Sequence, residues 1–200
     1  MARKFINFIK LFLVLTMLIF SLQSWTKADD ISEFEIEGMS IGDSLLDYFS
    51  EDEIKRALLR SGSGYKSNKF KRATFISSNF EIYNAVFSHL KLDDKTYEIY
   101  SIGAALDFPN DVKNCNIKRK KIVNELKDIF VNYVIDEYRN EHPQDTTGQS
   151  FYNATDFDFR NGSSARIMCF DWSEDIGFID HLRVTLNSKE FNLWLNNEAY

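Results

Sequence analysis

Five residues near the start of the chain, Gly38-Met39-Ser40-Ile41-Gly42, spell the G-x-S-x-G pattern of a serine nucleophile. Hydrolases that use this pattern place the serine on a sharp strand-to-helix turn, and an acid and a histidine follow it in the chain. Here no series of alternating strands and helices precedes the pattern. We therefore favour a structural role, in which Ser40 caps a helix and Asp43, at the third helical position, answers it as in a capping box. A catalytic Ser40 stays open as the alternative.

The second candidate for chemistry is an acidic stretch around Trp172. Its carboxylates are Asp171, Glu174, Asp175 and Asp180. Two carboxylates beside an aromatic ring could serve glycoside hydrolysis. A solvated connection between two strands explains the same composition, and we favour that interpretation. A hydrolase that uses Ser40 or the acids of residues 171–180 is the alternative function.

Metal and cofactor motifs are not evident in the sequence. The histidines His89, His142 and His181 are scattered and lack the paired spacing of a zinc or iron site. Asp156 and Asp158 resemble a calcium-binding pair, but they alternate with phenylalanines, as on a strand with one face in solvent. The glycine spacing fits neither a phosphate-binding loop nor a dinucleotide fingerprint. We predict no cofactor, no metal site and no catalytic residue.

In the first half of the chain, helices precede strands. Residues 41–60 carry apolar side chains at helical spacing, and Ser50 with the acids after it marks the start of a second short helix. Strands are predicted at residues 70–76, 81–90 and 97–106, which are rich in β-branched and aromatic side chains.

The second half repeats this order. Residues 111–139 are predicted to form the longest helix, with one apolar stripe. Three further strands are predicted at residues 151–159, 165–172 and 178–186. Asn161-Gly162 predicts a tight hairpin turn between the first two of them. A terminal helix follows Ser188 and buries apolar side chains.

This order predicts an α+β fold. We expect an antiparallel sheet with its helices packed on one face, arranged as two α-β-β-β units. Cys115 and Cys169 are the only cysteines, and two thiols in one small exported domain usually pair. Their disulfide would attach the start of the long helix to the strand at residues 165–172.

The first 28 residues have the order of a secretory signal peptide. Basic residues precede the uncharged apolar run 11–22, and Thr26 and Ala28 supply small side chains before a cut predicted after Ala28. The run is shorter than the ~20 residues of a transmembrane helix, although an uncleaved anchor that begins nearer Phe5 is the alternative. No cysteine lies near the cut, so no lipid anchor is expected.

The chain is therefore predicted to divide into a signal peptide, residues 1–28, and a single domain, residues 29–200. The signal peptide holds four of the 24 basic residues and none of the 30 acidic ones, which leaves the mature protein with a net charge of −10. Nucleic acids and anionic membranes attract clustered positive charge, so we expect no nucleic-acid partner and no stable membrane attachment after cleavage.

The residues Gly38-Met39-Ser40, followed by Ile41-Gly42-Asp43, resemble the Gly-Met-Ser/Thr helix start of small envelope lipoproteins. The best-known example is the small lipoprotein of the bacterial outer-membrane β-barrel assembly machinery. The resemblance covers residues 36–106 and extends to the β-lactamase inhibitory proteins. Both groups pair a helical hairpin with an antiparallel sheet and act by binding other proteins. The chain lacks the lipid-anchor cysteine of the lipoproteins.

As a whole, the mature chain resembles small exported bacterial proteins of no assigned activity, so this second resemblance implies a location and no chemistry. We predict a non-enzymatic, soluble protein of the periplasm, or a secreted one. It would act by binding an envelope protein or a small ligand.

Overall fold

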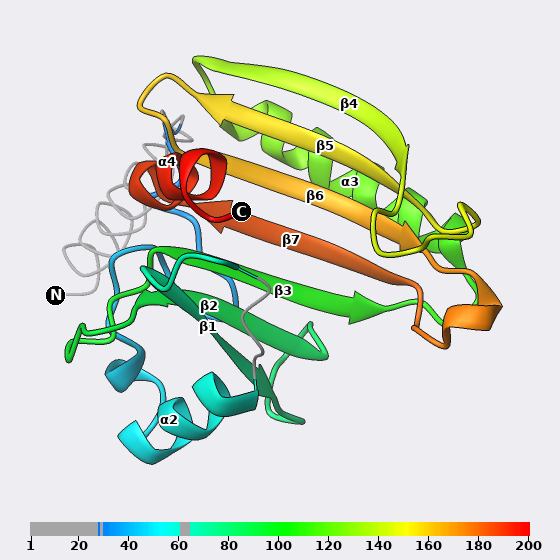
Figure 1. Cartoon of the computed structure of the whole chain (residues 1–200). Helices are drawn as coiled ribbons and strands as arrows, with labels where there is room; N and C mark the ends of the chain where they lie inside the picture. The colour runs from blue at the N-terminus through cyan, green and yellow to red at the C-terminus, as the bar shows by residue number, and fades with distance from the viewer. Residues whose placement is uncertain (1–27, 29, 61–64) are drawn as a thin grey trace, which may run out of the picture.

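The computed structural model describes residue 28, residues 30–60 and residues 65–200. Its seven strands form one antiparallel sheet in the order β1-β2-β3-β7-β6-β5-β4 (Figure 1). The strands are β1 (Phe70–Ile76), β2 (Ala85–Lys91), β3 (Ser101–Asp107), β4 (Tyr133–Glu141), β5 (Phe151–Phe159), β6 (Ser164–Asp171) and β7 (His181–Asn187). The helices are η1 (Leu45–Asp47), α2 (Glu51–Arg60), α3 (Val112–Ile129), η2 (Glu174–Ile176) and α4 (Lys189–Asn197). The predicted α+β class is confirmed.

The predicted disulfide is also confirmed. Cys115 lies in the first turn of α3 and Cys169 lies in β6, with their Cα atoms 5.9 Å apart. Both residues are fully buried. The disulfide therefore attaches the start of α3 to the sheet, as the sequence predicts.

The long predicted helix, residues 111–139, is wrong in its second part. α3 ends at Ile129, Asn132 adopts a positive φ of 58°, and β4 follows. Charged residues favour a helix over this stretch by propensity, but pairing with β5 along nine residues overrides that preference. The second unit therefore has four strands where three are predicted.

Two of the helices pack on the same face of the sheet. Ile54 and Ala57 of α2, and Cys115 and Val123 of α3, join the main core there. The short helix α4 lies on the opposite face, where Trp194 and Phe191 pack on Phe70. Figure 1 shows α4 in front of one end of the strands and α3 behind them. Among the described helices, only α4 therefore lies over this second face.

Residues 1–27, which include most of the predicted signal peptide, lie outside the described residues. Ala28 itself is buried, and its backbone bonds to Ile129 and Val131 at 3.1 Å each. A cut after Ala28 would remove these two hydrogen bonds. Among the described helices, none combines the length and apolar character needed to cross a bilayer.

Candidate functional site

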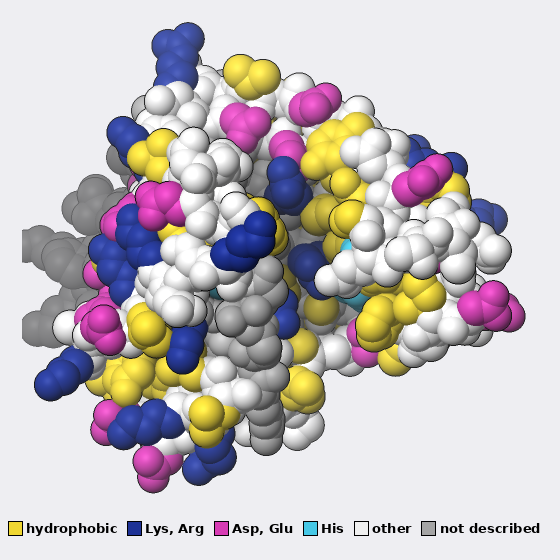
Figure 2. Space-filling view, viewed as in Figure 1, with side chains coloured by type: hydrophobic (Ala, Val, Ile, Leu, Met, Phe, Trp, Pro, Cys, Tyr) yellow, Lys and Arg dark blue, Asp and Glu magenta, His cyan; other side chains and the backbone are white. Residues whose placement is uncertain are grey.

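The side of the sheet opposite α2 and α3 gathers polar and aromatic side chains. We call its uncovered part the open face. Strand alternation turns every second residue toward it, from all seven strands. The side chains on it that concern the site are Arg72, Phe87, Tyr138, Asp156, Arg166, Met168, Phe170, His181 and Arg183. Figure 2 shows this side hollowed beside α4, with Lys or Arg, His and hydrophobic side chains around the hollow.

Arg183 occupies the middle of the open face, because β7 is the fourth of the seven strands. Its guanidinium lies over two rings, 4.7 Å from the centre of Phe170 and 5.4 Å from the centre of Phe87. Nη2 lies 3.4 Å from Nε2 of His181. His181 Nδ1 is 2.8 Å from the carbonyl of Ile179, which can only accept. Nδ1 therefore carries the proton, and Nε2 accepts from Arg183.

The charge of Arg183 has no carboxylate partner in the part of the chain that the structure describes. None of the ion pairs there includes it, and its buried Nε makes no hydrogen bond. Burial, with the positive charge of Arg72, lowers the pKa of Arg183 to about 10. The guanidinium is still charged at neutral pH. A buried donor without a partner costs about 1–3 kcal/mol, so this position favours an anion.

Gly103 allows the side chain of Phe87 to reach Arg183. Gly103 lies on β3, between Phe87 on β2 and Thr185 on β7. A Cβ atom at Gly103 would overlap the Phe87 ring and lie 2.9 Å from the carbonyl oxygen of Val184. The missing side chain therefore makes room for the ring over β3, where it supports the guanidinium.

Arg166, on the neighbouring strand β6, shows the opposite arrangement. Its Nε and Nη2 donate to the two carboxylate oxygens of Asp156 at 2.7 and 2.6 Å. Tyr138 lies 3.2 Å from the same carboxylate. The hydrogen bond to Asp156 raises the pKa of Arg166, and burial raises the pKa of Tyr138 to about 12. The charges of Arg166 and Asp156 cancel each other, whereas no carboxylate among the described residues balances the charge of Arg183.

The fold brings all three histidines to this side of the sheet. His89 is buried against Tyr65 and Phe191, and burial lowers its pKa to about 3. Burial also lowers the pKa of His142 and that of His181. All three are therefore neutral near pH 7. No group of three or more His, Cys, Asp or Glu residues within the described ranges could hold a metal ion.

The candidate serine turn, residues 38–42, serves the local backbone structure that leads into η1. The predicted cap is corrected from Ser40 to Ser44, whose side chain accepts from the backbone N–H of Leu46 at the start of η1. Asp43 does accept from the backbone N–H of Ser40, at 2.8 Å, but it closes a turn before the helix. The hydroxyl of Ser40 donates to the carbonyl of Phe34.

The two glycines of this stretch are explained by the backbone conformation of the turn. Gly38 and Gly42 have φ values of +77° and +92°, a region that L side chains rarely adopt. The helix therefore begins after Gly42 because the turn needs a positive φ there. The histidines lie on the opposite side of the sheet from the core that contains Ile36 and Met39, so Ser40 has no histidine partner among the described residues.

The acidic stretch lies at the end of β6 and before β7, next to the start of α3. Asp180 is buried and accepts from the backbone N–H of Trp172 at 2.7 Å, so it closes the loop. Burial, then the charge of Asp180, raises the pKa of Asp171. Glu174 and Asp175 are exposed on η2. These residues line a surface hollow of about 520 Å³. Asp156 and Asp158, the predicted strand pair, do lie on one face of β5. Asp156 forms an ion pair with Arg166.

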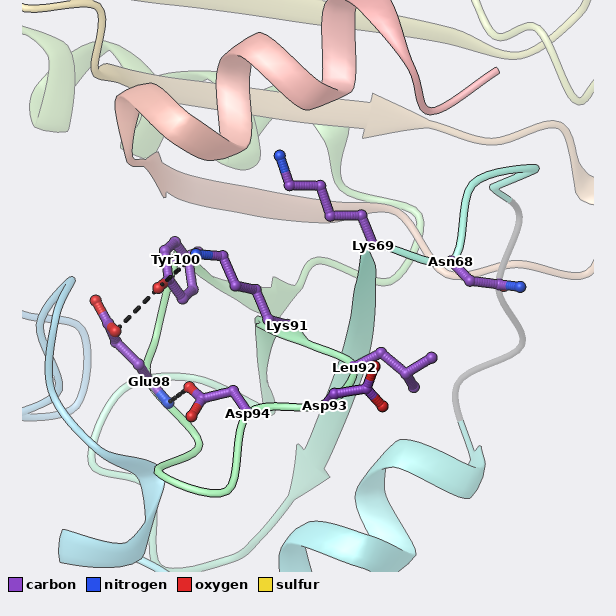
Figure 3. Close-up of a pocket in the computed structure, with 8 residues that line it drawn as sticks. All are labelled: Asn68, Lys69, Lys91, Leu92, Asp93, Asp94, Glu98 and Tyr100. Carbon is purple, nitrogen blue, oxygen red and sulfur yellow. Dashed lines mark hydrogen bonds between the residues drawn. The ribbon is translucent and has the colours of Figure 1, made fainter.

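Figure 3 shows a second hollow, of about 510 Å³, beside the connection between β2 and β3. Its charged groups bind one another. Lys91 donates to the hydroxyl of Tyr100 at 2.9 Å and pairs with Glu190 at 3.0 Å, and Tyr100 donates to Glu98. Unlike Arg183, Lys91, Glu190 and Glu98 already have partners.

Comparisons with protein-family models, curated proteins and solved structures gave no match. The resemblance of residues 36–106 to envelope lipoproteins and β-lactamase inhibitory proteins therefore stays a prediction. The site rests on the geometry of this chain alone.

Sequence reasoning missed Arg183 and its neighbours. His181, Arg183 and Thr185 alternate with leucines and a valine, which is the pattern of any strand with one wet face. The strand order turns this ordinary pattern into a site, because it places β7 in the centre of the sheet.

Proposed function

We propose that this chain is an exported, non-enzymatic binding protein that takes its ligand on the open face. The observation that carries this proposal is the charged, part-exposed Arg183, which lies on the central strand without a carboxylate partner among the described residues. Binding sites combine apolar walls with a few convergent polar groups. The open face has this composition, since Phe87, Met168 and Phe170 surround the guanidinium.

The walls of the open face support the same proposal. α4 closes one end, where Phe191 packs on Phe70. At the other end Trp172 contacts His142, with ring centres 4.1 Å apart, and Phe178, at 4.9 Å. A ligand between these walls would be held from the sides as well as from the floor.

Export belongs to the proposal too. Residues 1–28 would act as a signal peptide that delivers the protein to the periplasm or the exterior. The disulfide between Cys115 and Cys169 supports an oxidising compartment, because such bonds persist there.

A capture experiment tests the binding function. The tagged protein is expressed with its leader, recovered from the native envelope, and measured by native mass spectrometry for bound small molecules and by proteomics for partners. Met168→Trp fills the open face next to Arg183, its partner in the strand register. Ile117→Trp is the matched control, because Ile117 is 57% exposed on α3, behind the sheet.

We expect a bound species that wild type and Ile117→Trp retain and that Met168→Trp loses. Circular dichroism would establish that both variants fold. A species retained equally by all three proteins would contradict binding on the open face. Recovery of a chemically cleaved form of the bound species would contradict the non-enzymatic role.

A further inference from the structure

The unpaired guanidinium of Arg183 defines the chemistry of the ligand. We infer that the open face binds a small organic acid, whose carboxylate is held by Arg183 and whose apolar body lies against Phe87, Met168 and Phe170. This inference deepens the proposed binding function and rests on it.

The chain contains its own example of the proposed contact. Arg166 binds both oxygens of the Asp156 carboxylate, through Nε and Nη2. Arg183 presents the same group one strand away, yet its only side-chain hydrogen bond among the described residues goes to the neutral ring of His181. A planar carboxylate matches a guanidinium fork and forms short, charge-assisted hydrogen bonds with it. A ligand carboxylate would give Arg183 the charge partner that Asp156 gives Arg166, through guanidinium nitrogens other than the buried Nε.

The charge at this position favours a monoanion over phosphate. The neighbouring His89 and His181 are neutral near pH 7, so they add no positive charge. Arg72 is the other cation whose charge acts on Arg183, and it lies exposed on the edge strand β1. One part-buried guanidinium balances one carboxylate, whereas a phosphate dianion would leave a second negative charge against apolar walls.

The surroundings of Arg183 favour an apolar ligand body. The guanidinium lies over two phenyl rings, and Met168 is its direct neighbour on β6. On the other side the neighbour of Arg183 is the small, part-exposed Ala105 of β3, whereas the space over Gly103 is taken by the Phe87 ring. The small Ala105 side chain leaves room beside the charged group for an apolar ligand body, on the side of the sheet that Figure 2 shows hollowed.

Titration with matched probes tests this inference on the exported protein. The probes are 3-phenylpropionate, its neutral amide 3-phenylpropionamide, inorganic phosphate, and the peptide acetyl-Ala-Ala-Phe with a free carboxylate. Binding is followed by ¹⁵N-¹H NMR at constant ionic strength, including the Nε–H resonance of Arg183. We expect 3-phenylpropionate to saturate the protein below about 10 mM and to shift that resonance. The amide and phosphate should bind at least about tenfold more weakly, because each lacks the matched charge.

Three variants localise the effect. Arg183→Met should weaken 3-phenylpropionate binding about tenfold or more, whereas Arg160→Met, at an exposed arginine of the β5–β6 turn, should not change it. Met168→Glu places a carboxylate beside Arg183 and should abolish binding of the acid without unfolding the sheet. Met168→Glu supplies a partner for the charge of Arg183, so this variant tests the inference even if Arg183→Met folds poorly.

Several results would overturn the inference. These are equal affinity for the acid and its amide, unchanged binding in Arg183→Met or Met168→Glu, or no saturation by 3-phenylpropionate. Binding of the peptide more than about tenfold tighter than the free acid would replace the small acid by a peptide end. If the amide binds equally and Met168→Trp still blocks it, the charge argument fails while the proposed binding on the open face survives.

Discussion

Gly103→Ala should destabilise the protein and disturb the candidate site, although it adds a single methyl group. The new Cβ would overlap the ring of Phe87 and lie 2.9 Å from the carbonyl oxygen of Val184. The ring can rotate or shift. The carbonyl cannot shift freely, because it belongs to β7, which pairs with β3 through residues 101–107.

The size of the effect follows from these two contacts. Overpacking of an ordered interior costs typically about 1–3 kcal/mol. We expect a loss near the upper end, about 2–3 kcal/mol, because one of the two contacts is with backbone and cannot be relieved by a rotamer change. The displaced Phe87 ring would also leave the guanidinium of Arg183, which it approaches to 5.4 Å.

A double-mutant cycle separates the ring from the backbone. Urea unfolding, with the disulfide intact, gives the free energy of unfolding for wild type, Gly103→Ala, Phe87→Ala and the double variant. In the Phe87→Ala background the ring clash is gone and the 2.9 Å contact with Val184 remains. Gly103→Ala should therefore cost about 1 kcal/mol less in that background than in wild type.

Two results would refute this reasoning. A change of less than about 0.5 kcal/mol for Gly103→Ala would mean that the interior adapts without strain. An equal cost with and without the Phe87 ring would mean that the ring does not occupy the space over β3.

Three further predictions concern stability. Replacing Cys115 and Cys169 by serine should lower the free energy of unfolding by about 4 kcal/mol, as expected for a bond that spans 54 residues, in the same urea assay. Ser44→Ala should cost about 1–2 kcal/mol, because it removes both the cap of η1 and a 2.6 Å bond to the carbonyl of Thr96, whereas Ser40→Ala should cost less; equal effects would contradict the corrected cap. His89 has a folded-state pKa of about 3, below its ordinary 6.5, so the unfolded state binds more protons and stability falls as the pH drops from 6.5 toward 3. Acidification from pH 7 to 5 should remove about 2 kcal/mol in wild type and clearly less in His89→Leu, as measured by thermal and urea unfolding at both pH values.

The strands with strong alternation could be predicted from the sequence. β1 and β5 have the predicted bounds, and the hairpin at Asn161-Gly162 joins β5 to β6 as expected. In these segments the local preferences and the long-range pairing agree. Asn161 and Gly162 are the strongest case, because Gly162 has a φ of +90° that few other residues adopt.

The failures occur where pairing decides against propensity. Residues 133–141 contain two glutamates and an arginine that suit a helix, and the sequence does not show that β5 offers an edge to pair with. Similarly, residues 41–50 have helical spacing, but Gly42 requires a positive φ and only the three residues of η1 become helical. Distant contacts decide both outcomes.

The site was beyond prediction for a topological reason. The first unit of the chain supplies β1, β2 and β3, and the second supplies β4, β5, β6 and β7. β7 is the last strand in the chain, yet it lies between β3 and β6. Arg183 therefore sits at the junction of the two units, with one supporting ring from each, Phe87 from β2 and Phe170 from β6.

This placement links binding to the pairing of β7. The disulfide lies within the second unit and does not cross the junction, so hydrogen bonds and side-chain packing hold β3 against β7 among the described residues. A carboxylate on Arg183 would neutralise the charge at the junction and leave the pairing of β3 with β7 intact. A ligand that binds only the folded state stabilises it by an amount that rises with the ratio of ligand concentration to Kd. Because the site needs residues of β2, β6 and β7 together, the ligand should stabilise this junction more than the hairpins on either side.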